Sequence, residues 1–75
     1  PSTTISYSIP FNNYIRLELY NMMGEKIADL LNEFQTAGYH QYRFSTQDYQ
    51  LTSGIYYYRL VSGNYFSIKK MILLK

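Results

Sequence analysis

The chain has 75 residues, and a domain of this size buries only about 60% of the surface that its unfolded chain exposes, which leaves little room for a deep catalytic cavity. Its composition is 47% hydrophobic with ten Tyr, four Phe and no Cys, which favours β-strands and excludes a fold held by disulfides. The formal charge of +2 comes from seven basic and five acidic residues spread along the chain, too weak a field to indicate a nucleic-acid-binding protein.

Apolar and polar residues alternate in two early segments of the chain, which is the pattern of a strand with one buried face. The first predicted strand spans residues 5–9 and the second spans residues 15–20. In the second strand the alternate positions are Arg16, Glu18 and Tyr20, and we expect this charged face to be solvated.

A turn is predicted directly after the second strand. Asn21 can bond the backbone ahead of it, and Gly24 can take the positive φ that such a turn needs. Residues 25–31 are predicted to be the returning strand, although their apolar spacing of three and four also fits a helix. A polar connector over residues 33–38 follows and ends at Gly38.

A further strand, an irregular stretch and a long hairpin complete the predicted elements. Alternation predicts a strand over residues 40–44. Residues 45–53 should be irregular, with Leu51 packed back onto the core. Gly54 then opens a hairpin that runs to the last residue, so we expect the end of the chain to be held in a sheet.

The predicted hairpin turns at residues 62–64, where Gly63 and Asn64 can take the positive φ angles of a tight turn. The apolar residues of its returning strand change parity midway: they are first Phe66 and Ile68, then Met71 and Leu73. We therefore expect a β-bulge near Lys69 and Lys70, which would bring both pairs to one face.

Short strands separated by turns, with no alternation of strands and helices, predict an all-β fold. We expect a single domain over residues 1–75, an immunoglobulin-like antiparallel β-sandwich of six to seven strands. Four glycines are interpreted as structural turn residues: Gly24, Gly38, Gly54 and Gly63.

No catalytic or cofactor-binding motif is found in the sequence. None of the five carboxylates forms a close sequence pair suited to acid and base work on one substrate. His40 is the one histidine, and with no Cys and no second His to complete a metal site we interpret it as a half-buried packing residue. We therefore predict no catalytic residue, no metal and no cofactor, in a protein that is not an enzyme.

Aromatic residues of the hairpin offer one binding hypothesis. Tyr57, Arg59 and Tyr65 are of the types that stack sugars, which gives the alternative of an extracellular spacer or carbohydrate-binding module. Packing in the core and on the sheet surface is the simpler explanation, because alternation alone accounts for half of the aromatic residues.

Three lysines, Lys69, Lys70 and Lys75, flank the strongly β-prone end of the chain. One role for them is to discourage edge-to-edge aggregation of an exposed strand. The other is recognition by an acidic groove, for example by strand addition. The physical chemistry of the residues alone favours the first role.

We expect no membrane insertion, because no apolar run approaches the roughly 20 residues that span a bilayer. Residues 1–3 also lack the basic and apolar regions of a signal peptide. The chain enters a strand pattern within a few residues, so we interpret it as a piece of a longer protein whose export signal lies elsewhere.

Five blocks of sequence, in the right order, resemble one family. They are residues 3–7 (Thr-Thr-Ile-Ser-Tyr), 19–27 (Leu-Tyr-Asn-Met-Met-Gly-Glu-Lys-Ile), 37–40 (Ala-Gly-Tyr-His), 53–60 (Ser-Gly-Ile-Tyr-Tyr-Tyr-Arg-Leu) and 69–75 (Lys-Lys-Met-Ile-Leu-Leu-Lys). No single block is specific, but together they cover nearly the whole chain and closely resemble the C-terminal sorting domain of type IX secretion cargo. That domain is similar in turn to the immunoglobulin-like domain of flagellar hook-capping proteins.

The resemblance implies a sorting domain at the end of a larger secreted protein of Gram-negative bacteria of the Bacteroidetes type. Such a domain reaches the periplasm, is recognised by the type IX outer-membrane translocon and brings its upstream cargo domain to the cell surface, where a sortase removes it in many family members. By position, the implied recognition residues are Lys69, Lys70, Met71, Ile72, Leu73, Leu74 and Lys75.

Overall fold

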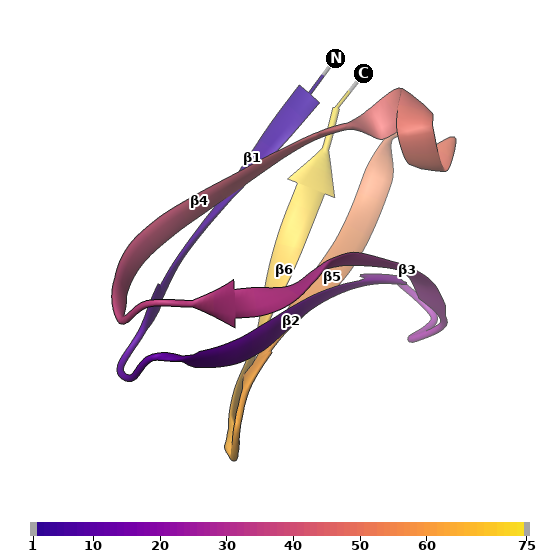
Figure 1. The fold of residues 1–75 in the computed structure, drawn as a ribbon. Helices are drawn as coiled ribbons and strands as arrows, with labels where there is room; N and C mark the ends of the chain where they lie inside the picture. Colours follow the sequence, from indigo (N-terminus) through magenta and orange to yellow (C-terminus); the bar gives the residue numbers. More distant parts are fainter. Residues whose placement is uncertain (1, 75) are drawn as a thin grey trace.

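The computed structural model describes residues 2–74 and contains six strands and one short 3-10 helix in that range (Figure 1). In chain order they are β1 (Ser2–Ile9), β2 (Asn13–Asn21), β3 (Lys26–Gln35), β4 (Gly38–Ser45), η1 (Thr46–Tyr49), β5 (Gly54–Ser62) and β6 (Tyr65–Leu73). Within residues 2–74, no helix is long and apolar enough to cross a membrane.

The strands form two antiparallel sheets that share one core. β1 pairs with β4 in a two-stranded sheet, and the order β3-β2-β5-β6 makes a four-stranded sheet. The buried core residues are Ile5, Tyr7, Ile9, Ile15, Leu17, Leu19, Leu30, Phe44, Leu51, Tyr56, Leu60 and Leu73. The predicted all-β antiparallel sandwich is confirmed, with six strands in the described residues.

The period of two decides which face of β2 is buried. Ile15, Leu17 and Leu19 are fully buried, as their alternation predicts. Complete burial of such a side chain stabilises the fold by about 1.5–3 kcal/mol. Because successive side chains point to opposite faces, Arg16 and Glu18 lie on the outer face of the four-stranded sheet.

β3 is a strand, as predicted, and the helical alternative is wrong. Its register against β2 shifts twice because Ile27 and Leu30 are extra residues without a partner on β2. Leu30 is buried and Ile27 packs against the core, so the two bulges create the spacing of three and four that imitates a helix. β3 also continues through the first three positions of the predicted connector at residues 33–38, where Phe34 meets Tyr14 edge to face with ring centroids 5.4 Å apart.

Asn21 organises the turn between β2 and β3. Its Oδ1 accepts hydrogen bonds from the backbone N–H groups of Met23 and Glu25, both at 2.9 Å. Gly24 has a φ of +84°, a value that side-chain-bearing residues rarely adopt. The predicted turn is therefore confirmed, and the bonds of Asn21 fix where β3 begins.

The connection from β4 to β5 is tied to the core. The segment predicted to be irregular, residues 45–53, contains η1, and Leu51 is buried as predicted. The Tyr56 hydroxyl donates a hydrogen bond to the Thr52 carbonyl oxygen at 2.8 Å and accepts one from the Thr52 N–H at 3.2 Å. These contacts hold the connection against β5.

β5 and β6 form a hairpin with an unbroken register. Gly63 has a φ of +60°, whereas the φ of Asn64 is not positive, so the prediction of positive φ is wrong for Asn64. A glycine with positive φ at the first central position alone indicates a type II′ turn. Gly38 and Gly54, the other two glycines interpreted as turn residues, are the first residues of β4 and β5.

The predicted bulge near Lys69 and Lys70 is wrong, because no residue of β6 lacks a partner on β5. The bulge was expected in order to bring all the apolar residues of β6 to the core. The structure instead buries Leu73 and leaves Phe66 and Ile68 exposed on the outer face. Side chains therefore alternate regularly between the two faces along the whole of β6. Phe66 and Ile68, near the start of the strand, lie on the exposed face, and Met71 and Leu73, near its end, lie on the core face.

Candidate functional site

One side of β6 carries a row of exposed apolar side chains. β6 is an edge strand, since it pairs with β5 and, within residues 2–74, with no other strand. Five residues of one parity form what we call the outer stripe: Phe66, Ile68, Lys70, Ile72 and, just past the strand, Leu74. Four of the five are large, exposed apolar side chains. An exposed row of this kind, apolar except at Lys70, typically marks a binding surface.

The structure divides the sequence-predicted recognition segment between two faces. Leu73 is buried in the core and Met71 packs against it, so these two side chains hold the fold together. Lys70, Ile72 and Leu74 belong to the outer stripe and are exposed. The alternation of β6 thus separates the residues that stabilise the domain from those that a partner can reach.

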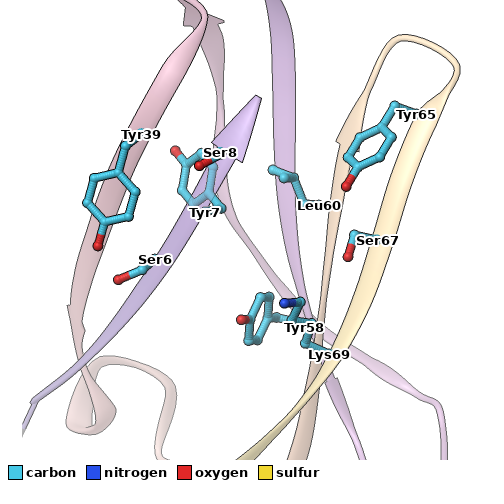
Figure 2. A pocket seen from close by; sticks show the side chains of 9 residues that line it. All are labelled: Ser6, Tyr7, Ser8, Tyr39, Tyr58, Leu60, Tyr65, Ser67 and Lys69. Atoms are coloured by element: carbon cyan, nitrogen blue, oxygen red, sulfur yellow. The ribbon is translucent and has the colours of Figure 1, made fainter. Parts of the chain in front are cut away.

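The two remaining residues of the segment are Lys69 and Lys75. Lys75 lies outside the described residues. Lys69 has the parity of the core face, but it is exposed and lines a groove of about 330 Å³ between β1 and β6. The groove is lined by Ser6, Tyr7, Ser8, Tyr39, Tyr58, Leu60, Tyr65, Ser67 and Lys69. Figure 2 shows Tyr39 and the two β1 serines on one wall, Tyr65 and Ser67 on the other, and Lys69 next to Tyr58. One cation among hydroxyl groups forms no acid–base pair.

The outer face of β2 holds a buried carboxylate, so the prediction of a solvated face is wrong for Glu18, which is only 3% exposed. It accepts hydrogen bonds from Arg16 Nε at 2.8 Å, Tyr20 OH at 2.9 Å and Arg59 Nε at 2.7 Å, and Lys26 Nζ lies 3.4 Å away. We call these five residues the charge cluster. Burial raises the pKa of Glu18, but the hydrogen bonds from Arg59, Tyr20 and Arg16 outweigh it and lower the pKa from 4.5 to about 2.

The structure does not bring together the three residues of the carbohydrate-binding alternative. Tyr57 and Arg59 line a hollow on the outer face of the four-stranded sheet. Tyr65 lines the groove on the opposite side of the β5–β6 hairpin. One sugar cannot contact all three side chains, so this geometry does not support the alternative.

His40 has a packing environment, in agreement with its interpretation as a half-buried residue. Its ring stacks on Tyr7 with centroids 5.6 Å apart, and its Nε2 lies 2.7 Å from the carbonyl oxygen of Thr36. The Tyr7 hydroxyl in turn donates to Gln35 Oε1 at 2.6 Å. In the described part of the chain, no group of three or more His, Asp or Glu side chains is placed to hold a metal ion.

Phe66 and Ile68 are members of the outer stripe that sequence reasoning missed. Their signal is present in the sequence, because positions 66, 68, 70, 72 and 74 share one parity. A β-bulge that turns Phe66 and Ile68 towards the core would hide this parity, and the regular register of β6 against β5 shows that there is no such bulge. Exposure of large apolar residues on a regular edge strand is itself informative.

Comparison with known proteins gives one match. A family model described as a secretion system C-terminal sorting domain matches residues 1–74. No curated protein and no solved structure is matched. The matched range includes both sheets, the charge cluster and all of the outer stripe.

Proposed function

The chain belongs to the family of secretion system C-terminal sorting domains, and on this basis we propose that the type IX outer-membrane translocon recognises it through the outer stripe and the free edge of β6. Domains of this family are sorting signals of type IX secretion rather than catalytic domains. They direct an attached cargo through the periplasm to the cell surface or the extracellular space.

The observation that carries this proposal is the row of exposed apolar side chains on an edge strand. Complete burial of a fully exposed side chain of this size is worth about 1.5–3 kcal/mol, and Phe66, Ile68, Ile72 and Leu74 are still 56–82% exposed, so a partner that covers the whole row gains several kcal/mol before the costs of association. The same row would cost solubility in a domain that had no partner.

Alternation along β6 makes recognition compatible with folding. Met71 and Leu73 face the core, so a translocon that contacts Lys70, Ile72 and Leu74 need not disturb the sandwich. The translocon can therefore recognise the folded domain without unfolding its last strand.

The free edge of β6 supplies a second means of contact. Its unpaired backbone N–H and C=O groups can add a strand from a partner, and the side chains of the outer stripe would then select the partner. Lys70, in the middle of the stripe, prevents the edge from pairing indiscriminately with other edges.

Lys69 and Lys75 remain in the proposed recognition segment because of their place in the sequence. Family membership also supports the surface sortase as a second partner.

A secretion assay with matched variants tests the proposal. The domain is fused to a periplasmic reporter in a host with type IX secretion, and export is compared for two double variants. Ile72→Asp with Leu74→Asp alters the stripe at residues that are 63% and 82% exposed. Met22→Asp with Met23→Asp alters the β2–β3 turn at residues that are 65% and 82% exposed.

The stripe variant should leave the reporter in the periplasm, and the turn variant should export it like the wild type. Both domains should unfold at wild-type urea concentrations, because none of the four side chains is buried. A milder Phe66→Ser variant replaces the double variant if the latter proves unstable. Normal export by a correctly folded stripe variant would contradict the proposal.

A further inference from the structure

A hollow lies beside the outer stripe on the same face of the four-stranded sheet. It has a volume of about 290 Å³ and is lined by Tyr20, Gly24, Tyr57, Arg59 and Ile68. These residues come from β2, the turn that follows it, β5 and β6. Because Ile68 is also a member of the outer stripe, a partner that covers the stripe reaches the edge of the hollow.

Arg59 enters this hollow with its guanidinium group already oriented. Its Nε donates a hydrogen bond to Oε1 of Glu18 at 2.7 Å, and Glu18 is almost completely buried. Among residues 2–74, Arg59 has no other hydrogen-bond acceptor, so the N–H groups of its two terminal nitrogens are free to bind a ligand. A guanidinium held in this way presents the planar pair of donors that a carboxylate accepts in bidentate fashion.

The charge around the hollow favours an anion. In the described part of the chain, the cations on or near the hollow and the charge cluster are Arg16, Lys26, Arg59 and Lys70, and the carboxylates are Glu18, Asp29 and Glu25, which follows the lining residue Gly24. Four positive and three negative charges leave an excess of one positive charge. The Glu18 carboxylate already accepts hydrogen bonds from Arg16, Tyr20 and Arg59, and its role is to orient the Arg59 guanidinium group.

We propose that the hollow binds one Asp or Glu side chain of the translocon protein that covers the outer stripe, an inference that rests on the proposed function. The carboxylate would bond the terminal nitrogens of Arg59, and its methylene groups would lie against Tyr20, Tyr57 and Ile68. These apolar walls suit a carbon-bearing acid better than inorganic phosphate. The Glu18 carboxylate behind Arg59 also disfavours a dianion.

Two conservative variants separate binding from stability in the export assay. Arg59→Lys and Arg16→Lys each replace one Nε donor to Glu18 with an ammonium group, but only Arg59 lines the hollow. Arg59→Lys should reduce export by about tenfold or more, while Arg16→Lys should retain it. Urea unfolding should show similar stability for both. Equal export by the two variants, or export that simply follows stability, would overturn the inference.

A binding experiment tests the hollow without a secretion host. The isolated domain is titrated in NMR with N-acetyl-glutamate α-methylamide, and the matched glutamine compound, inorganic phosphate and glucuronate serve as comparison probes. The glutamate compound should shift the Nε–H signal of Arg59 and the ring signals of Tyr20 and Tyr57 at millimolar concentrations. These shifts should disappear in Arg59→Lys. Absence of shifts with the glutamate compound, or stronger shifts with phosphate or glucuronate, would overturn the inference.

The two proposals can fail separately. If the glutamate compound binds at Arg59 but the stripe variant is exported normally, the proposed recognition surface is wrong and the anion site stands. If the stripe variant blocks export while Arg59→Lys neither reduces export nor changes binding, the recognition surface stands and the carboxylate site is wrong.

Discussion

Replacing Glu18 with Gln should destabilise the domain strongly, although Glu18 lies on the outer face of a sheet. The substitution keeps the size of the side chain but removes the negative charge that Arg16, Arg59 and Lys26 share. These cations would then lie close together around a neutral amide. An amide also brings two N–H donors into a site where the neighbouring groups are themselves donors.

The magnitude of this effect follows from the pKa of Glu18, which is about 2 in the folded domain compared with its ordinary value of 4.5. Each pKa unit corresponds to about 1.36 kcal/mol, so the difference of about 2.5 units corresponds to about 3 kcal/mol. The value is an upper limit, because the basic partners are partly exposed and solvent screens their charges. Since the folded pKa is lowered, the stabilisation is complete above about pH 5 and is lost as the pH falls towards 2.

Urea unfolding of the wild type and Glu18→Gln across this pH range is the assay. At neutral pH the variant should be less stable by up to about 3 kcal/mol, and the difference should shrink as the pH approaches 2. Glu33→Gln is the matched control, because Glu33 is exposed, and its stability should change by no more than about 0.5 kcal/mol. Equal stability at neutral pH, or a difference that does not depend on pH, would show that the Glu18 carboxylate does not stabilise the fold through its charge.

Two further predictions concern the turns and the connection to β5. Gly63→Ala should destabilise the domain by about 1–2 kcal/mol, because Gly63 has a positive φ that an alanine rarely adopts. Gly24 also has a positive φ, but Gly24→Ala should cost less, because only at Gly63 would the new Cβ meet a side chain, 2.7 Å from Asn13 Nδ2. Thermal unfolding measures this, and a larger effect at Gly24 would count against it. Tyr56→Phe should cost about 1 kcal/mol and accelerate amide hydrogen exchange at Thr52, because both hydrogen bonds to that residue are lost. Unchanged exchange at Thr52 would disprove the role of the hydroxyl.

Features that depend on neighbouring residues could be predicted from the sequence. The alternation of Ile15, Leu17 and Leu19 identifies β2 and its buried face, because side-chain direction in a strand has a period of two. The turn at Asn21 and Gly24 is likewise local, since the Asn21 side chain bonds only the next few backbone N–H groups.

Features that depend on how strands meet could not be predicted. Glu18 and Arg59 are 41 positions apart, and only the pairing of β2 with β5 brings them together, so the burial of Glu18 has no local signal. The bulges at Ile27 and Leu30 replace the period of two in β3 with a helix-like spacing. The apolar pattern of β3 therefore fits both a strand and a helix, because the two bulges change its spacing.

The candidate site was predictable in part. Its position on the last strand followed from the sequence, but the division of that strand into a core face and an outer face required the register of β6 against β5. Sequence reasoning placed Leu73 among the recognition residues, whereas the structure buries it in the core. The hollow at Arg59 could not be predicted from the sequence, because four separate segments of the chain build it. The burial of Glu18 could not be predicted for the same reason.

Site-specific photocrosslinking during export identifies the protein that the outer stripe contacts. A photoreactive phenylalanine analogue is placed at Ile72 of the outer stripe or at Met23 of the β2–β3 turn, two exposed positions whose replacement should not disturb the core. We expect a crosslink to the type IX translocon from position 72 and none from position 23. A translocon crosslink from position 23 and none from position 72, in domains that are both exported, would contradict this expectation.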